Sequence, residues 1–123
     1  MANTIHDIGV APQIGTYSDA VEVPANARWL CTAGAPGLAP DGSFAPDIVG
    51  QAEAAWAHVV TMLEKAGMTI GTQYLVRVDD IPAYAKVRAR VFGAAHPAST
   101  LLVVPALVRP EFLLEVEVLA AKA

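Results

Sequence analysis

Apolar residues between positions 47 and 67 recur at intervals of three and four, which is the spacing of one face of a helix. Pro46 and Asp47 suit the first turn of such a helix, and Gly67 suits its end. The pattern predicts a helix of about five turns with one buried stripe. The stripe comprises Ile48, Ala52, Ala55, Trp56, Val59, Met62, Leu63 and Ala66, and the expected solvent side carries Gln51, His58, Thr61 and Lys65.

Shorter stretches that are rich in β-forming residues predict strands. Residues 16–23 and 28–32 are joined by a turn at 24–27, and we expect them to form a hairpin. Residues 72–78 alternate between polar and apolar side chains as a strand does. The apolar residues 101–108 and 112–119 flank a three-residue connection, which predicts a second hairpin.

A second helix is predicted after the strand at 72–78. The segment DDIP at 79–82 suits a helix N-terminus, and Tyr84, Val87, Val91 and Phe92 fall on one side of the helix that follows. The resulting order is β-β-α-β-α-β-β, which indicates an α+β fold. The chain lacks the long crossovers needed to place helices on both faces, so we expect both helices on one face of a mixed sheet.

The composition indicates one domain, over residues 1–123, with an unusually apolar surface. Hydrophobic residues make up 54% of the chain and charged residues only 16%, less than the quarter or so that is usual. Part of this apolar excess would lie on the sheet face that no helix covers. We therefore expect that face to be covered by identical subunits in a closed ring.

Charge and targeting patterns exclude several classes of partner. The net charge is −4 and the basic residues are scattered, so we expect no nucleic-acid partner. No apolar stretch of about 20 residues exists and residues 1–10 lack a signal-peptide pattern, so we expect neither a membrane span nor secretion. The single cysteine fits a reducing compartment, and we expect a cytoplasmic protein.

Metal and cofactor motifs are absent from the sequence. His6, His58 and His96 are too far apart for metal-ligand spacing, and we expect neither a metal nor a cofactor. Gly34-Ala35-Pro36-Gly37 lacks the pattern of a phosphate-binding loop and is interpreted as a turn. Cys31 lies in a predicted strand, and we interpret it as a buried filler rather than a nucleophile.

Two carboxylates in the last predicted strand are the candidates for proton chemistry. Glu115 and Glu117 are two residues apart and therefore share one face of the sheet, while Leu114, Val116 and Val118 point to the other face. One interpretation is that the glutamates lie on a wet face at the end of the strand. The other is that Glu115 borders a cleft, where burial raises its pKa and fits it for general acid/base catalysis.

Six short motifs lie in order along nearly the whole chain. IGTYS at 14–18 is similar to IGPY, CTAG at 31–34 to TSGQ, and QA at 51–52 to Q(A/T) in a first helix. LEKAG at 63–67 is similar to EAAG, PAS at 97–99 to PAR, and LEVE at 114–117 to IEIEA. Together they resemble the RidA family, whose members are also called YjgF or L-PSP endoribonuclease-like proteins.

This resemblance implies a chorismate-mutase-like α+β domain that assembles as a homotrimer with clefts between the subunits. It also implies hydrolysis of reactive enamines and imines, such as 2-aminoacrylate, to 2-ketoacids and ammonia. In that reaction an arginine holds the substrate carboxylate, main-chain groups near a glycine position the substrate, and a glutamate places or activates water. Tyr17, Gly34 and Glu115 stand at matching positions in this sequence.

The sequence departs from the family pattern at position 99, where Ser99 replaces the expected arginine. A desolvated guanidinium–carboxylate pair is worth about 2 to 5 kcal/mol, and a neutral hydroxyl hydrogen bond about 1 kcal/mol. Affinity for a 2-imino acid is then expected to fall roughly tenfold to a thousandfold. Two interpretations of Arg88 remain open: it reaches the cleft from a neighbouring subunit and restores the charge, or it lies on a solvated helix face.

Two functions of different classes follow. The first is an enzyme that hydrolyses an imine, an enamine or a similarly labile compound other than the standard 2-aminoacrylate, with Glu115 as the catalytic group. The alternative is a small-molecule-binding or regulatory trimer without turnover. Ribonuclease action conflicts with the acidic charge and with the lack of a His/Lys constellation. The expected substrate-binding residues are Tyr17, Gly34, Ser99, Thr100, Leu101 and Arg88.

Overall fold

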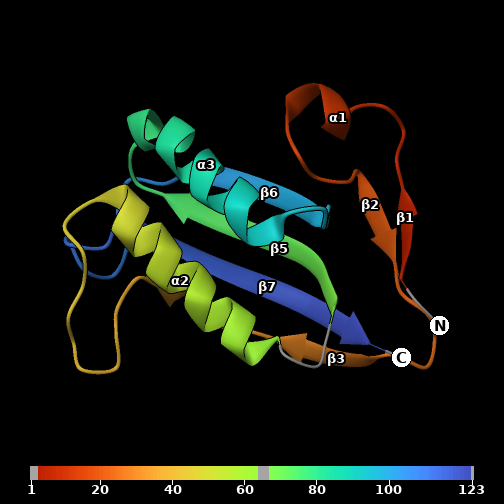
Figure 1. Ribbon diagram of the computed structural model, residues 1–123, viewed down its shortest axis with the longest axis horizontal. Coiled ribbons are helices and arrows are strands. Elements are labelled where there is room, and N and C mark those ends of the chain that lie inside the picture. Colours follow the sequence, from red (N-terminus) through yellow and green to blue (C-terminus); the bar gives the residue numbers. More distant parts are fainter. Residues whose placement is uncertain (1–2, 64–66, 123) are drawn as a thin grey trace.

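The computed structural model describes residues 3–63 and 67–122. Two main helices lie in front of a mixed sheet, and a small N-terminal lobe lies beside them (Figure 1). In chain order the elements are β1 (Thr4–His6), α1 (Ala11–Ile14), β2 (Ala20–Glu22), β3 (Arg28–Cys31), β4 (Ala35–Pro36), α2 (Ile48–Met62), β5 (Gly67–Leu75), the 3₁₀ turn η1 (Val78–Asp80), α3 (Ile81–Phe92), β6 (Ala98–Val103) and β7 (Leu114–Lys122).

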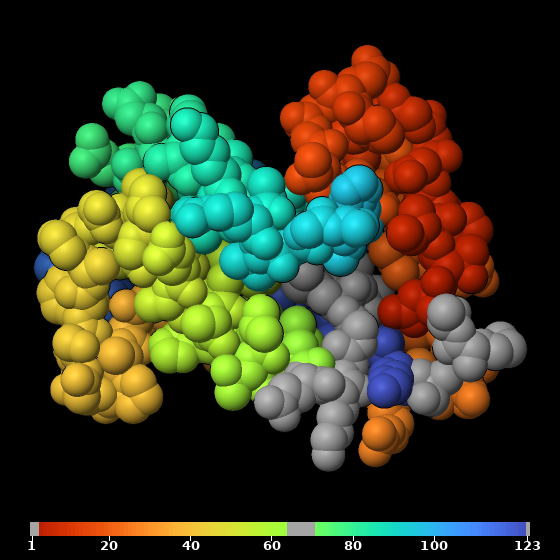
Figure 2. Space-filling view, in the orientation of Figure 1, coloured from red at the N-terminus to blue at the C-terminus, as the bar shows by residue number. Residues whose placement is uncertain are grey.

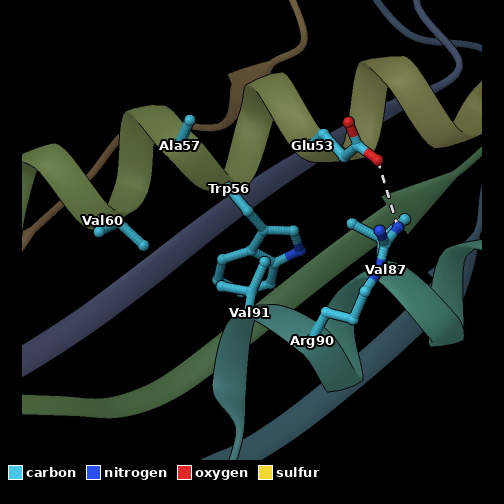
Figure 3. A pocket seen from close by; sticks show the side chains of 7 residues that line it. All are labelled: Glu53, Trp56, Ala57, Val60, Val87, Arg90 and Val91. Carbon is cyan, nitrogen blue, oxygen red and sulfur yellow. Dashed lines mark hydrogen bonds and ion pairs between the residues drawn. The ribbon is translucent and has the colours of Figure 1, made fainter.

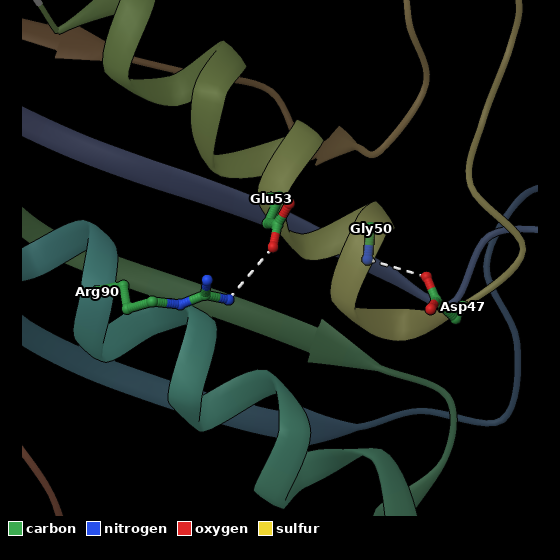
Figure 4. A network of polar contacts seen from close by, with 4 residues as sticks. All are labelled: Asp47, Gly50, Glu53 and Arg90. Atoms are coloured by element: carbon green, nitrogen blue, oxygen red, sulfur yellow. Dashed lines mark hydrogen bonds and ion pairs between the residues drawn. The ribbon is translucent and has the colours of Figure 1, made fainter.

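The helix predicted from residue 47 forms α2, and its first turn is capped by a side chain. Asp47 adopts an extended backbone, and its Oδ1 accepts a hydrogen bond of 3.0 Å from the main-chain N of Gly50 (Figure 4). The helix ends at Met62, so Gly67 does not stop it as we expected but begins β5. Lys65 and Ala66, which were assigned to this helix, lie outside the described residues.

Two polar residues of α2 that we expected on the solvent side are wrongly assigned. Gln51 is 1% exposed, donates to the carbonyls of Ala45 and Glu111, and accepts from the main-chain N of Leu113. His58 is half-buried, with Nε2 2.8 Å from the carbonyl of Leu38. These contacts hold two loops against the helix. The spacing of apolar residues shows which side of a helix packs on the sheet, but it does not show that a loop covers another side.

The pairing of the strands differs from both predicted hairpins. The sheet has the order β3-β7-β5-β6, with β4 also paired to β7. β6 pairs in parallel with β5 because α3 returns the chain to the same edge of the sheet, and β7 then pairs antiparallel with both β5 and β3. Residues 112–119 therefore do not form a hairpin with 101–108, and the segment Ala35–Pro36, interpreted as a turn, is a short strand against β7.

The N-terminal lobe contains a two-stranded sheet that is separate from the main sheet. β2 pairs with β1, a strand that the sequence did not predict, and not with β3. Asp19 holds the lobe together, because its carboxylate accepts hydrogen bonds from the main-chain N atoms of Ile8 and Ala11, both 2.9 Å long. Ser18 is 1% exposed and joins the lobe to the strand segment at Ala98. The lobe therefore lies against the start of β6.

The core lies between the sheet and the two helices, as predicted. Leu114, Val116 and Val118 of β7 are buried on the helix side. Trp56 of α2 and Phe92 of α3 meet there with ring centroids 4.8 Å apart at an interplanar angle of 84°. The expected α+β fold with both helices on one face of a mixed sheet is confirmed (Figure 1).

The opposite face of the sheet carries exposed apolar residues. Trp29 is 56% exposed, Leu102 41% and Leu119 39%. Cys31 pairs with Leu119 and is also exposed, so its interpretation as a buried filler is wrong. Neither main helix covers this face (Figure 1). Within the described part of the chain, no helix is long and apolar enough to cross a membrane.

Candidate functional site

A cavity of about 470 Å³ lies between α3, the start of β6 and the N-terminal lobe. The surface view shows a hollow at this place, between α3 and the N-terminal segment (Figure 2). Apolar, aromatic and polar groups share its wall, so it offers both packing and hydrogen bonding to a small molecule. Its lining residues are Ile14, Gly15, Tyr17, Gln73, Ile81, Tyr84, Ala85, Arg88, Ser99, Thr100 and Leu101.

Five of the residues singled out from the sequence meet in this cavity. They come from three distant segments: the loop after α1, the helix α3, and the strand β6. Gly34 and Glu115, which were assigned to the same cleft, do not line the cavity of this chain. The five residues that do are Tyr17, Arg88, Ser99, Thr100 and Leu101.

Arg88 does not lie on a solvated helix face, and the wall of the cavity is not neutral. The side chain is only 8% exposed, and its guanidinium carbon lies 4.4 Å from the centroid of the Phe92 ring. Nε donates to Oε1 of Gln73 at 3.1 Å, and Nη1 donates to the carbonyl and hydroxyl oxygens of Thr16 at 3.2 and 3.1 Å. The residue thus joins α3 to the loop that forms the other wall of the cavity.

Gln73 organises the polar groups behind the cavity. It is 1% exposed, and its Oε1 accepts hydrogen bonds from both the Tyr84 hydroxyl, at 2.9 Å, and Arg88. Its Nε2 donates to Ser99 Oγ at 2.9 Å and to the carbonyl of Thr100 at 3.0 Å. One amide therefore connects the hydroxyl at position 99 to the guanidinium on α3.

Tyr84 extends this network into the core. Its hydroxyl accepts a hydrogen bond of 3.2 Å from Trp56 Nε1 while it donates to Gln73. Burial raises the pKa of Tyr84 far above its usual value, so its phenol stays protonated and remains a donor. The amide of Gln73 is held in one orientation as a result.

Sequence reasoning missed Gln73, Tyr84 and Thr16 as residues of the site. A signal for Gln73 was present, because strand alternation places it on the same face as the core residue Leu75. A glutamine at an inward position needs buried hydrogen-bond partners. Tyr84 was predicted on the buried side of α3, but nothing in the sequence indicated that its hydroxyl would meet a glutamine from β5.

Glu115 lies on the opposite face of the sheet from the cavity. It pairs with Tyr74, the neighbour of Gln73 that points away from the helices. A Cβ atom at Gly34 would collide with Oε1 of Glu115, so these two residues are in contact. The sheet therefore separates Glu115 and Gly34 from the cavity residues Tyr17, Arg88, Ser99 and Leu101 of the same chain. Thr100 also lines the cavity, but it pairs with Thr72 opposite Glu117, so its side chain lies on the face of Glu115.

The surroundings of Glu115 favour its protonated form. Burial raises the pKa of its carboxyl, and the nearby charge of Glu117 raises it further. Glu117 accepts a hydrogen bond of 2.6 Å from the Tyr74 hydroxyl, an interaction that raises the pKa of Tyr74. Glu115 and Glu117 share one face as predicted, and Glu115 has the electrostatic setting expected of a proton-transfer group.

A second hollow, of about 370 Å³, lies between α2 and α3 on the outer surface (Figure 3). Apolar side chains line it, and its two charged residues pair with each other, because Arg90 Nη2 lies 3.2 Å from Glu53 Oε1 (Figure 4). Both side chains are more than half exposed, so this pair adds little stability. The hollow therefore offers no group poised for chemistry.

Comparison with known proteins identifies related sequences and folds. A family model described as Endoribonuclease L-PSP matches residues 8–122. The conserved Rid-family protein YyfB of Yersinia pestis, a protein of unknown function, has 25% sequence identity and a TM-score of 0.83. That match covers 99% of this chain and 100% of the other.

Two further solved structures have the same fold at lower identity. Rv2704 of Mycobacterium tuberculosis, a member of the YjgF/YER057c/UK114 family, has 22% identity and a TM-score of 0.66 over 97% of this chain and 98% of its own. TdcF of E. coli, whose structure contains bound serine, has 21% identity and a TM-score of 0.70 over 89% of this chain and 91% of its own. The family model and the solved structures therefore agree over most of the chain: the first matches its sequence and the others match its fold.

Proposed function

The chain belongs to the L-PSP endoribonuclease family, also called RidA or YjgF, and from this premise we propose that it is a hydrolase of reactive imines or enamines. The proposed site is a cleft between subunits of a homotrimer. The cavity around Tyr17 and Ser99 forms one side of the cleft, and Glu115 of the adjacent subunit forms the other. The products are a carbonyl compound and ammonia.

The observation that carries this proposal is the separation of the site residues by the sheet. Tyr17, Ser99 and Arg88 line a cavity on the helix face, whereas Glu115 and Gly34 lie in contact on the other face. A chemical site that uses both groups is incomplete in one chain and needs a second copy. The exposed apolar residues on the same sheet face as Glu115 give that second copy a surface to pack against.

The proposed reaction needs few groups from the protein. Water adds to the carbon of the C=N bond and gives a carbinolamine, which then expels ammonia and leaves a C=O bond. Glu115 in its ionised form accepts the proton of the attacking water and returns a proton to the departing nitrogen. Its raised pKa brings the carboxyl closer to neutral pH, where proton transfer in both directions is most efficient.

The lining of the cavity favours a substrate larger than 2-aminoacrylate. Ile14, Ile81 and Leu101 contribute apolar surface, and the volume of about 470 Å³ exceeds what a three-carbon compound fills. At position 99 the strand offers a hydroxyl. We therefore propose that the substrate carries an apolar substituent, and that 2-aminoacrylate is not the preferred substrate.

Ammonia release tests this proposal. Imines of leucine and phenylalanine are generated in situ by an amino-acid oxidase, and 2-aminoacrylate by a dehydratase, with and without the protein. We expect faster release from the leucine and phenylalanine imines than spontaneous hydrolysis gives, and a loss of about a hundredfold or more in Glu115→Gln. Glu53→Gln is the matched control, because Glu53 lies on the outer surface of α2.

Two results would contradict the proposed function. No acceleration for any of these imines would favour the binding trimer without turnover. A monomer by light scattering, at the concentration of the assay, would remove the shared cleft on which the chemistry depends. An unchanged rate in Glu115→Gln would instead exclude this residue as the proton-transfer group.

A further inference from the structure

The charge of Arg88 is not neutralised within its own chain. Its hydrogen-bond partners are the neutral groups of Gln73 and Thr16. Among residues 3–63 and 67–122, no carboxylate oxygen lies within 4.0 Å of the guanidinium, and its Nη2 has no hydrogen-bond partner. A buried cation of this kind is unusual, because buried charges are normally paired.

Burial does not remove this charge. Desolvation lowers the pKa of Arg88, but a guanidinium stays protonated in proteins at any pH in the working range. If the residue only held the loop at Thr16, a neutral donor would serve without the desolvation penalty that a buried ion carries. The uncompensated cation thus points to an anion that arrives with the ligand.

The hydroxyl of Ser99 is free to donate a hydrogen bond to such an anion. Gln73 Oε1 accepts from two donors, Tyr84 and Arg88, so its Nε2 must face Ser99. Ser99 Oγ accepts that N–H, which leaves the hydroxyl hydrogen as a donor. Ser99 and Arg88 both line the cavity and both contact Gln73, so a donor and a cation are available in one site.

We propose that Arg88 and Ser99 together bind the carboxylate of the ligand, so that the anion anchor of this cavity comes from α3 and not from position 99. This inference rests on the proposed function for the choice of site, but it does not depend on turnover. The ligand class is a monoanionic 2-imino or 2-oxo acid with an apolar side chain. The apolar residues that also line the cavity, Ile14, Ile81 and Leu101, would take that side chain.

Calorimetric titration with 4-methyl-2-oxopentanoate and with its neutral amide tests the anchor without any reaction. On the unmodified protein we expect the acid to bind at least about tenfold more tightly than the amide. Arg88→Met should remove most of this preference and weaken binding of the acid by roughly tenfold to a thousandfold. Binding of the amide should change much less. If Arg88 only held the loop at Thr16, the variant would instead weaken binding of the acid and the amide equally.

A relocated charge gives the sharper test. Ser99→Arg alone should raise affinity for the acid by less than about tenfold, because an anchor is already present. In Arg88→Asn combined with Ser99→Arg, the cation moves from the helix to the strand, and preference for the acid should return. The acid–amide comparison and the single Ser99→Arg variant leave Arg88 in place, so the test stands even if Arg88→Met does not fold.

The outcomes separate this inference from the proposed function. Equal affinity of the unmodified protein for the acid and the amide would overturn the anchor, even if imines are hydrolysed. A gain of a hundredfold or more in Ser99→Arg alone would overturn it too, because the cavity would then have lacked a working cation. Preference for the acid that depends on Arg88, without hydrolysis of any imine, would support the anchor and contradict the enzyme.

Discussion

Among the residues that line the cavity, replacement of Gln73 by leucine should lower the stability of the fold the most. The side chain is 1% exposed, and Gln73→Leu leaves the Tyr84 hydroxyl and Arg88 Nε without their acceptor. Each buried donor left without a partner costs about 1 to 3 kcal/mol, and burial of the leucine offsets about 1 to 2 kcal/mol. The free energy of unfolding should therefore fall by about 1 to 4 kcal/mol, against the 5 to 15 kcal/mol typical of a domain.

Urea denaturation at one fixed protein concentration measures this loss, since subunit association would shift the apparent stability. With a slope of about 2 kcal/mol per M, the midpoint should fall by about 0.5 to 2 M. Gln51→Leu is the matched control, because Gln51 is equally buried but holds loops far from the cavity. Both variants should be destabilised, and only Gln73→Leu should also weaken binding of the carboxylate ligand.

Two results would refute this reasoning. A loss below about 1 kcal/mol in Gln73→Leu would mean that Tyr84 and Arg88 find other acceptors readily. An equal fall in carboxylate affinity for Gln51→Leu would mean that the effect of Gln73 is general loosening and not its contact with Arg88.

Three further predictions concern the carboxylates. Burial and Glu117 hold the pKa of Glu115 above its usual value, so activity should fall as pH drops through that pKa, and Glu117→Gln should move the fall to lower pH in a kcat profile. Gly34→Ala should push the carboxylate of Glu115 aside and lower kcat at least about tenfold, with a urea midpoint close to that of the unmodified protein. Asp47→Ala removes the cap that accepts from Gly50, and the free energy of unfolding should fall by about 0.5 to 2 kcal/mol in the same urea assay; no change would show that the α2 N-terminus is satisfied in another way.

The sequence predicted the elements of the fold better than their pairing. The helical period over 48–62 and the alternation of β7 both reflect local geometry, and both are confirmed. Strand pairing depends on where α3 returns the chain, and no local pattern shows that β7 enters the sheet between β3 and β5. For the same reason the exposed position of Cys31 could not be read from its apolar neighbours.

The site was predicted in part through the family resemblance. That resemblance singled out Tyr17 and Ser99, which are far apart in the sequence and line one cavity. The burial of Arg88 could have been predicted from the sequence itself. The residue lies four positions after Tyr84 and four before Phe92, on the helix face that was expected to be buried. Ser99, taken alone, suggested a cavity without a cation. A substitution at one position does not show whether a basic residue elsewhere, here Arg88, supplies the charge instead.

The alternation of β7 has a consequence for how the two faces of the sheet can diverge. Residues 114, 116 and 118 belong to the core, and residues 115 and 117 to the opposite surface. A slip of the strand by one residue would bury two acids and expel three apolar side chains, so only one alignment is tolerated. Within that alignment, substitutions at 115 and 117 do not enter the core between the sheet and the helices, so the chemistry of the acidic face can change while the scaffold is kept.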